Sequence, residues 1–214
     1  MEVRLIAKTL GVAEAKSGQD LISFIARVSN PSNQSNFDTA PKLLKYLVKH
    51  QHWSPLEHAF MTVEIKTSRA IAQQILRHRS FTYQEFSQRY SQAMSYEPYE
   101  ARRQDTKNRQ NSIDDLPEEV KEEFIQAQDK IWKESYSKYE ELIGKGVAKE
   151  QARFILPLNT QTTIYMTGPV RSWIHYIDLR SDPSTQKEHR DIALAIREIF
   201  YKEFPDVAEA MWGG

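Results

Sequence analysis

The side chains of this 214-residue chain that could do chemistry are most concentrated in residues 77–90. This stretch reads RHRSFTYQEFSQRY and contains three arginines, one histidine, one glutamate and several hydroxyl groups. Burying guanidinium and polar groups is costly unless each finds a partner, so the segment must lie in water or face an anion. The apolar residues before it, 70–76, have helical spacing and should attach it to a hydrophobic core.

Two pairs of residues in this stretch indicate what kind of anion it binds. Arg77 and Arg79 are two residues apart, as are Ser87 and Arg89, and residues with this spacing point to the same side of an extended backbone. A serine hydroxyl beside a guanidinium group is suited to binding phosphate. As an alternative, Arg77 and Arg79 only stabilise the end of a helix, which leaves the rest of the stretch unexplained. The sequence therefore predicts a site for a phosphate-bearing ligand.

The overall composition shows no general preference for an anionic partner. Hydrophobic residues make up 40% of the chain and charged residues 27%, and 29 basic residues balance 29 acidic ones. A chain of this length can bury one sizeable core. The N-terminus lacks the apolar run of a signal peptide, and no stretch is long enough to span a bilayer. We therefore expect a single domain over residues 1–214, cytoplasmic and free of membrane.

Two kinds of site are disfavoured by what the sequence lacks. There is no cysteine, which excludes disulfides, thiolate metal ligands and thiol nucleophiles. His50, His52 and His58 lie close together, but without cysteine or a His-Glu-x-x-His spacing we expect no metal site. There is also no Gly-x-Gly-x-x-Gly motif, so a bound dinucleotide would be held by arginines and backbone donors and not by a Rossmann loop.

Hydrophobic periodicity predicts an α/β protein of the α+β type, with an antiparallel-leaning sheet flanked by long helices. Strands are expected over residues 1–10, 59–66 and 160–167. Helices are expected over residues 20–28, 41–49, 117–144 and 171–180, in a short segment ending at Pro157, and from a capping box of Thr185 and Glu188. The apolar stripe of the long helix over 117–144 is interpreted as core or subunit contact. Residues 97–116 are expected to be a solvated connection without chemistry.

The arginine-rich stretch also resembles a known signature. Arg-His-Arg, followed after seven residues by Ser and continuing as Gln-Arg-Tyr, is similar to the motif of the flavin-dependent thymidylate synthases. Further blocks that resemble this family lie at residues 52–58 (HWSPLEH), 151–158 (QARFILPL) and 171–180 (RSWIHYIDLR). One departure is Pro169, where relatives commonly have asparagine or serine, so a side-chain contact to flavin is missing there.

The resemblance implies a homotetramer with active sites between subunits. It implies the reductive methylation of dUMP to dTMP, with 5,10-methylenetetrahydrofolate as carbon donor, NADPH as reductant through FAD, and tetrahydrofolate as product. The absence of cysteine agrees with this, because the other route to dTMP attacks uracil with a cysteine thiolate. It implies no nucleic-acid partner.

The resemblance also implies roles for individual residues. The residues implied to contact the cofactor are His52, Ser54, Arg77, His78, Arg79, Glu85, Arg171 and His175. The residues implied to contact dUMP are Gln74, Arg77, Glu85, Ser87, Gln88, Arg89, Arg153 and Arg180. Within the second set, Ser87, Arg89 and Arg153 would hold the phosphate, and Gln74 and Arg180 the base end. Arg180 and His52 are the catalytic candidates, Arg180 because a guanidinium near the uracil carbonyl stabilises developing negative charge.

A different class of protein remains as the alternative. Arginines interleaved with Phe81, Tyr83, Phe86 and Tyr90 are also typical of a single-stranded nucleic-acid-binding module, where aromatic rings stack on bases. The net charge of +0 and the lack of a recognisable RNA-binding motif argue against it.

Overall fold

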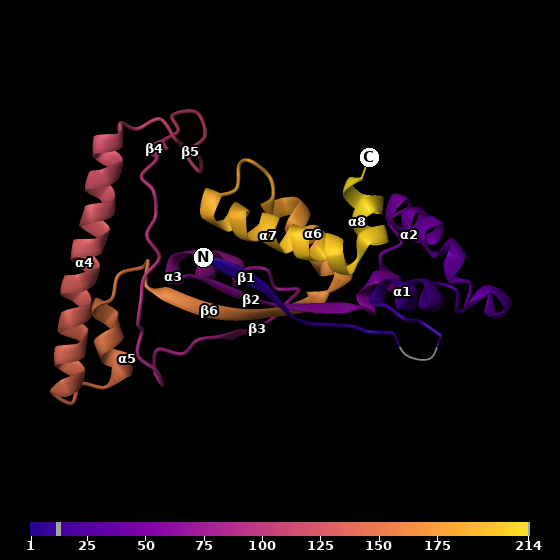
Figure 1. Ribbon diagram of the computed structural model, residues 1–214, viewed down its shortest axis with the longest axis horizontal. Coiled ribbons are helices and arrows are strands. Elements are labelled where there is room, and N and C mark those ends of the chain that lie inside the picture. The colour runs from indigo at the N-terminus through magenta and orange to yellow at the C-terminus, as the bar shows by residue number, and fades with distance from the viewer. Residues whose placement is uncertain (12–13, 214) are drawn as a thin grey trace.

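The protein is organised around a four-stranded antiparallel sheet with strand order β1-β2-β6-β3 (Figure 1). The computed structural model describes residues 1–11 and 14–213. The strands are β1 (Glu2–Lys8), β2 (Phe60–Ser68), β6 (Gln161–Pro169) and β3 (Thr82–Glu85). All three strand pairs are antiparallel, as the sequence predicted, because each neighbour runs back along the previous strand.

Alternation along the two central strands explains which face of the sheet is buried. Val63 and Ile65 on β2 pair with Met166 and Ile164 on β6, and all four are fully buried. Tyr165, between Ile164 and Met166, points to the opposite face and is exposed, and Glu64 on that face is buried and bonded to Arg4 and Tyr165. Because strand side chains alternate with a period of two, this pattern places one apolar face against the core.

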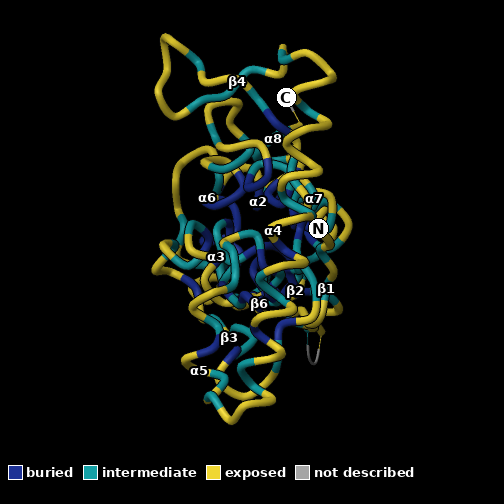
Figure 2. The backbone as a smooth tube through the Cα atoms, turned by 90° about the vertical axis from the view of Figure 1, so that its left-hand side faces the viewer, coloured by how far each residue is buried: buried dark blue, intermediate teal, exposed yellow. Residues whose placement is uncertain are grey.

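Helices cover the apolar face of the sheet and extend past one end of it. In Figure 1, α6 and α7 lie above the sheet, and α1, α2 and α8 lie together at the right. Their bounds are α1 Gly18–Ala26, α2 Ala40–Lys49, α3 Arg69–Ile75, α6 Val170–Arg180, α7 Lys187–Glu203 and α8 Pro205–Trp212. Trp173 of α6 is fully buried, and its indole N–H donates to the Met61 carbonyl at 3.0 Å, which ties α6 to β2. Figure 2 shows the buried positions in the middle of the molecule.

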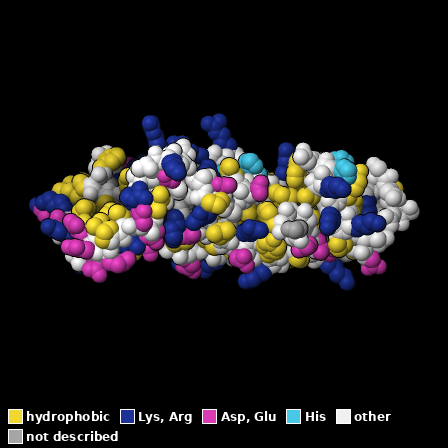
Figure 3. Space-filling view, turned by 90° about the horizontal axis from the view of Figure 1, so that it is seen from above, with side chains coloured by type: hydrophobic (Ala, Val, Ile, Leu, Met, Phe, Trp, Pro, Cys, Tyr) yellow, Lys and Arg dark blue, Asp and Glu magenta, His cyan; other side chains and the backbone are white. Residues whose placement is uncertain are grey.

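The longest helix stands away from this core. Helix α4 (Glu118–Gly144) is followed by α5 (Lys149–Ala152), and both lie at the left in Figure 1. Only two of its residues, Trp132 and Tyr139, are buried. Val120, Phe124 and Ile131 are exposed, and Figure 3 shows hydrophobic and acidic side chains together at this end. The expected helix is confirmed, but its apolar stripe is largely not part of the core of one protomer.

Three local expectations were wrong. Residues 97–116 contain two short paired strands, β4 (Arg103–Gln104) and β5 (Ser112–Ile113). They also bury Ala101 and Glu97, and the carboxylate of Glu97 is bonded to the N-terminus and to Gln161. The capping box at Thr185 does not form, since Glu188 is instead bonded to Arg102 and Gln186. Strand β6 continues through Gly168 and Pro169, which lie at its end opposite Met61 and Phe60.

Four short 3-10 helices complete the part of the chain that the structure describes. They span Pro31–Asn33, Phe37–Thr39, Ser54–Glu57 and Arg153–Ile155. The third of these, η3 (Ser54–Glu57), leads directly into β2, and its Leu56 is fully buried. The segment with His52 and Glu57 is therefore fixed against the core.

The close approach of Gly168 to Phe81 gives a test of this packing. A Cβ atom at Gly168 would lie 2.4 Å from Cδ1 of Phe81, a residue that is 8% exposed. Gly168→Ala must displace this ring and should lower the free energy of unfolding by about 1–3 kcal/mol. Gly144→Ala is the control, because a Cβ atom at Gly144 would have no neighbour within 4 Å. Urea denaturation measures both, and equal stability of the two variants would contradict the packing.

Candidate functional site

The arginine-rich segment begins with a turn that is fixed by a tyrosine. The chain leaves α3 at Ile75 and turns through residues 77–81 before it enters β3. The Tyr83 hydroxyl lies 2.9 Å from the carbonyl oxygens of both Ile75 and His78 and donates to them. Burial raises the pKa of Tyr83, so the hydroxyl keeps its proton. Phe81 is buried against Trp173, with ring centroids 4.6 Å apart, and is therefore not a platform for stacking bases.

The histidine of the turn holds an arginine from the far end of the chain. The Nε–H of Arg180, at the end of α6, donates to Nε2 of His78 at 2.9 Å. A guanidinium has no acceptor, so His78 must accept, and its ring proton lies on Nδ1. Burial, and next the charge of Arg180, lower the pKa of His78 to about 4. His78 is therefore neutral near neutral pH, and Arg180 keeps its charge.

A buried aromatic layer lies behind this pair. Tyr176 packs its ring edge-on to His78 at 4.8 Å between centroids, and its hydroxyl lies 3.0 Å from Nε2 of His189. His189 is fully buried, and burial is the main cause that lowers its pKa to about 3. Neither residue was among the expected site residues: Tyr176 was given no role within the block 171–180, and His189 belonged to no motif.

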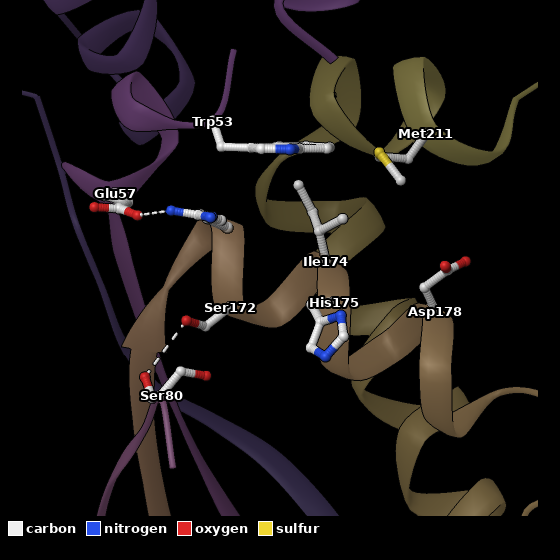
Figure 4. Close-up of a pocket in the computed structure, with 9 residues that line it drawn as sticks. Trp53, Glu57, Ser80, Ser172, Ile174, His175, Asp178 and Met211 are labelled. Atoms are coloured by element: carbon white, nitrogen blue, oxygen red, sulfur yellow. Dashed lines mark hydrogen bonds and ion pairs between the residues drawn. The ribbon is translucent and has the colours of Figure 1, made fainter. Parts of the chain in front are cut away.

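The exposed face of α6 lines the first of three cavities, which we name the α6 cavity. It has a volume of about 510 Å³ and is drawn in Figure 4. Steps of four and three residues bring Arg171, His175 and Asp178 to this face, as the sequence predicted. Trp53, from the segment before η3, and Met211, from α8, form its upper wall. Arg171 forms an ion pair with Glu57.

The second cavity, the α7 cavity, lies where α6 ends and α7 begins. It has a volume of about 710 Å³ and is lined by Arg180, Gln74 and the connection from Asp182 to Gln186. Asp178 lines both this cavity and the α6 cavity, so the two are neighbours. Gln110, from residues 97–116, also lines it. A segment that was expected from the sequence to be a connection without chemistry therefore contributes one residue to the lining of this cavity.

The third cavity, the α3 cavity, contains two further substrate candidates, Gln88 and Arg153. It has a volume of about 310 Å³ and is lined by Arg69, Gln88 and Arg153 among others. Gln88 is 5% exposed, and its side-chain nitrogen has no hydrogen-bond partner among the described residues. Glu85 accepts hydrogen bonds from Arg69 at 2.8 Å and from Thr162 at 2.9 Å, which fixes the end of β3 beside this cavity.

Ser87 and Arg89 are not arranged as the sequence predicted. They lie where the chain turns after β3, not in extended backbone, because β3 ends at Glu85. The Ser87 hydroxyl accepts a 3.3 Å hydrogen bond from the backbone N–H of Arg89. The Arg89 side chain instead forms an exposed ion pair with Glu150 at 3.2 Å.

Four of the cofactor candidates are exposed on the surface. Arg77, Arg79, His52 and Ser54 make no side-chain hydrogen bond within residues 1–11 and 14–213. His52 lines none of the three cavities, whereas its neighbour Trp53 does. His52 lies against Tyr46, with ring centroids 5.8 Å apart. Of the residues that line the α6 cavity, Trp53 and Glu57 were not among the site residues expected from the sequence.

Two further properties concern the described part of the chain. Across residues 1–11 and 14–213, no cluster of three or more histidine, aspartate or glutamate side chains has the arrangement of a metal site. None of the helices described there combines the length and apolar character needed to cross a membrane.

The fold is that of a mixed α/β protein with an antiparallel sheet. Each of the three cavities described above has at least one arginine in its lining, and such groups can bind an anionic nucleotide. Residues 5–206 match the family model Thy1, thymidylate synthase complementing protein. The chain therefore belongs to the Thy1 family.

Two similar proteins are named as flavin-dependent thymidylate synthases. The chain is 57% identical over 215 residues to the flavin-dependent thymidylate synthase of Synechocystis sp., and 54% identical over 213 residues to the probable flavin-dependent thymidylate synthase of Paramecium bursaria Chlorella virus 1. Each alignment covers 99% of both chains. A solved structure, the UMP/dUMP methylase PolB from Streptomyces cacaoi bound with 5-Br dUMP, has the same fold, with a TM-score of 0.83 and 22% identity over 98% of this chain and 93% of that chain.

The two buried histidines predict how stability depends on pH. Both are neutral in the folded protein, while in the unfolded chain a histidine binds a proton below about 6.5. The unfolded state therefore binds more protons, and stability falls as the pH drops below 6.5 towards 4 and 3. His189→Gln should reduce the loss of unfolding free energy between about pH 7 and about pH 5 by about 2 kcal/mol.

Urea denaturation at the two pH values measures this difference. The exposed His58→Gln variant is the control and should keep the wild-type difference. An unchanged difference in His189→Gln would show that His189 is not held neutral by burial.

Proposed function

We propose that this chain is a flavin-dependent thymidylate synthase. It methylates dUMP to dTMP, with 5,10-methylenetetrahydrofolate as carbon donor and NADPH as reductant through FAD. The observation that carries the proposal is the adjacency of the α6 and α7 cavities, which share Asp178. One presents His175 and an aromatic wall suited to a flavin ring, and the other presents Arg180 and Gln74 to a nucleotide base. Family membership and the names of the similar proteins support the same function.

Arg180 is the catalytic residue in this proposal. Its Nε is bonded to neutral His78, so its remaining N–H groups are directed at the α7 cavity. When C5 of uracil becomes nucleophilic, negative charge develops on the ring carbonyl, and a pre-positioned guanidinium stabilises it. His78, assigned from the sequence to FAD, acts here by positioning Arg180. His52 remains a proposed flavin contact through its place next to Trp53.

The residues around the α6 cavity fit a flavin dinucleotide. Arg77 and Arg79 are exposed guanidinium groups without hydrogen-bond partners in the described residues, which suits them to a pyrophosphate. Arg171, His175 and Trp53 line the cavity that would take the ring. Ser54, which follows Trp53 in the chain, and Glu85, at the end of β3, are further proposed contacts. The flavin, when bound, supplies the reducing equivalents that NADPH replenishes.

The phosphate of dUMP is proposed to bind beside the α3 cavity. Gln88 has a buried, unpaired donor there, and Arg153 lines the same cavity. The Arg89–Glu150 pair is exposed on both sides, so breaking it to bind phosphate costs little. Ser87 adds a hydroxyl donor to this group.

No side chain is arranged as a covalent nucleophile in this mechanism. The chain has no cysteine. The hydroxyl group of Ser87 bonds only to the Arg89 backbone N–H among the described residues, and no histidine there is bonded to it to serve as a base. Uracil must therefore be activated by Arg180 and methylated without attachment to the protein.

The active sites are proposed to lie between the subunits of a homotetramer, and the distribution of these groups supports sites that are shared between copies of the chain. No residue lines both the α3 cavity and the α7 cavity, although one nucleotide must reach both phosphate and base groups. The sheet face that carries Phe60 and Tyr165 is not covered by α6 or α7, and the α4 stripe is exposed. Both surfaces are available to bury apolar area against other copies of the chain.

Mixed subunits test this arrangement. Arg89→Ala should weaken dUMP binding by about 10- to 100-fold, because a charged hydrogen bond is lost, and Arg180→Ala should remove turnover. If each site takes these residues from different subunits, co-expression of the two variants restores intact sites at about a quarter of all positions. Turnover of the mixed tetramer measures this, and activity no higher than that of the single variants would contradict sites shared between subunits.

The folate product tests the chemistry itself. Without a cysteine, and with electrons supplied through the flavin, the folate should leave as tetrahydrofolate, one for each dTMP. Turnover should require NADPH and FAD and should survive thiol-alkylating reagents. Chromatography after a single anaerobic turnover separates the folates, and stoichiometric dihydrofolate would contradict the mechanism.

A further inference from the structure

A chain of hydrogen bonds connects the segment 97–116 to Gln74 in the α7 cavity. Arg102 donates through Nε to the Ser112 hydroxyl at 2.9 Å and forms an ion pair with Oε1 of Glu188. The other carboxylate oxygen of Glu188 accepts from the side-chain N–H of Gln186 at 2.9 Å. The carbonyl oxygen of Gln186 in turn accepts from the side-chain N–H of Gln74 at 2.6 Å.

The direction of each bond in this chain is determined by Glu188. A carboxylate only accepts hydrogen bonds, so Gln186 must turn its NH₂ group towards Glu188 and its carbonyl towards Gln74. Gln74 then has to donate to that carbonyl. Its own carbonyl oxygen is left facing the α7 cavity, and no hydrogen bond to this oxygen occurs among the described residues.

The carboxylate that determines this direction is itself held in place. The side chains of Arg102 and Glu188 are 11% and 10% exposed. Glu188 also lies in the first turn of α7, where the helix dipole favours a carboxylate. Because this ion pair is weakly solvated and lies at a helix N-terminus, it holds the Glu188 carboxylate in place. The carboxylate in turn orients the side-chain amides of Gln186 and Gln74.

Among the groups that line the α7 cavity, which include the carboxylates of Asp178 and Asp182, Gln74 and Arg180 together present an acceptor and a set of donors to a base. Gln74 presents a carbonyl oxygen, and Arg180 presents N–H groups whose orientation is set by its bond to His78. Uracil has an N3–H donor between two carbonyl acceptors, which complements this pair. Cytosine has an N3 lone pair and an amino group at the corresponding positions, so its N3 would face the Gln74 carbonyl without a proton between them.

We propose that Arg102, Glu188 and Gln186 are positioning residues that orient the Gln74 amide and thereby make the site prefer uracil over cytosine nucleotides. The inference rests on the proposed function, since it takes the α7 cavity as the site of the base. A purely structural role of these residues in stabilising α7 predicts something different. Loss of such a role would change the affinities for dUMP and dCMP equally, whereas loss of the amide orientation changes the ratio of the two affinities.

Calorimetry on the FAD-loaded protein, with dUMP as ligand and dCMP as competitor, tests this inference. In Glu188→Gln an amide replaces the acceptor-only group, so Gln186 and Gln74 are free to reverse. Gln186→Ala breaks the chain at an exposed residue and leaves the buried ion pair intact. In both variants the ratio of Kd for dCMP to Kd for dUMP should fall about tenfold. Glu198→Gln, at an exposed position of α7, should keep the wild-type ratio.

The outcomes separate the possible failures. A ratio that stays at the wild-type value in folded Gln186→Ala, with or without a parallel loss of both affinities, would overturn the inference. If Glu188→Gln does not fold, Gln186→Ala alone decides. A wild-type protein that binds neither nucleotide would overturn the proposed function, and this inference with it. A wild-type protein that binds dUMP and dCMP equally would overturn this inference only.

Discussion

The site depends on an arginine that is held by a neutral partner. Arg180 donates to His78, and no ion pair involves Arg180 in residues 1–11 and 14–213. A carboxylate in place of His78 would neutralise much of the charge that the α7 cavity presents. Burial and the arginine itself keep the imidazole unprotonated, so the same contact fixes the guanidinium and preserves its charge. The hydrogen bonds from Tyr83 to the turn and the packing of Tyr176 against His78 hold the histidine in position for its bond with Arg180.

The fold explains why many apolar and charged groups have no partner within one described chain. Packing α6 and α7 on one face of the sheet satisfies the core of one protomer, as the burial of Trp173 and Ile164 shows. The other face, the stripe of α4, and the guanidinium groups of Arg77 and Arg79 are left without protein partners in the described chain. Apolar surface of this kind is stabilised by contact with further copies, and exposed guanidinium groups by anionic ligands. Contact with further copies of the chain would thus bury the apolar surface, and binding of anionic ligands would pair the guanidinium groups.

Local patterns predicted most elements, and their failures have a common cause. The strands and helices follow from periodicity, because side-chain alternation is a property of neighbouring residues. The capping box at Thr185 and the extended pairing of Ser87 with Arg89 were wrong, because distant groups compete for the same atoms. Glu188 is bonded to Arg102, 86 residues away. Strand β3 ends at Glu85, whose side chain is bonded to Arg69 and Thr162, and the chain then turns before Arg89.

The sequence by itself determined the available chemistry: no thiol, several arginines in the family's blocks, and the face of α6 that carries His175. Only the tertiary structure decided which groups meet. Arg180 and His78 are 102 residues apart, and Arg171 and Glu57 are 114 apart. Hydrogen-bond partners over such separations depend on how the strands are ordered in the sheet, and the protonation of a histidine depends on how deeply it is buried. Neither quantity is encoded in the spacing of nearby residues.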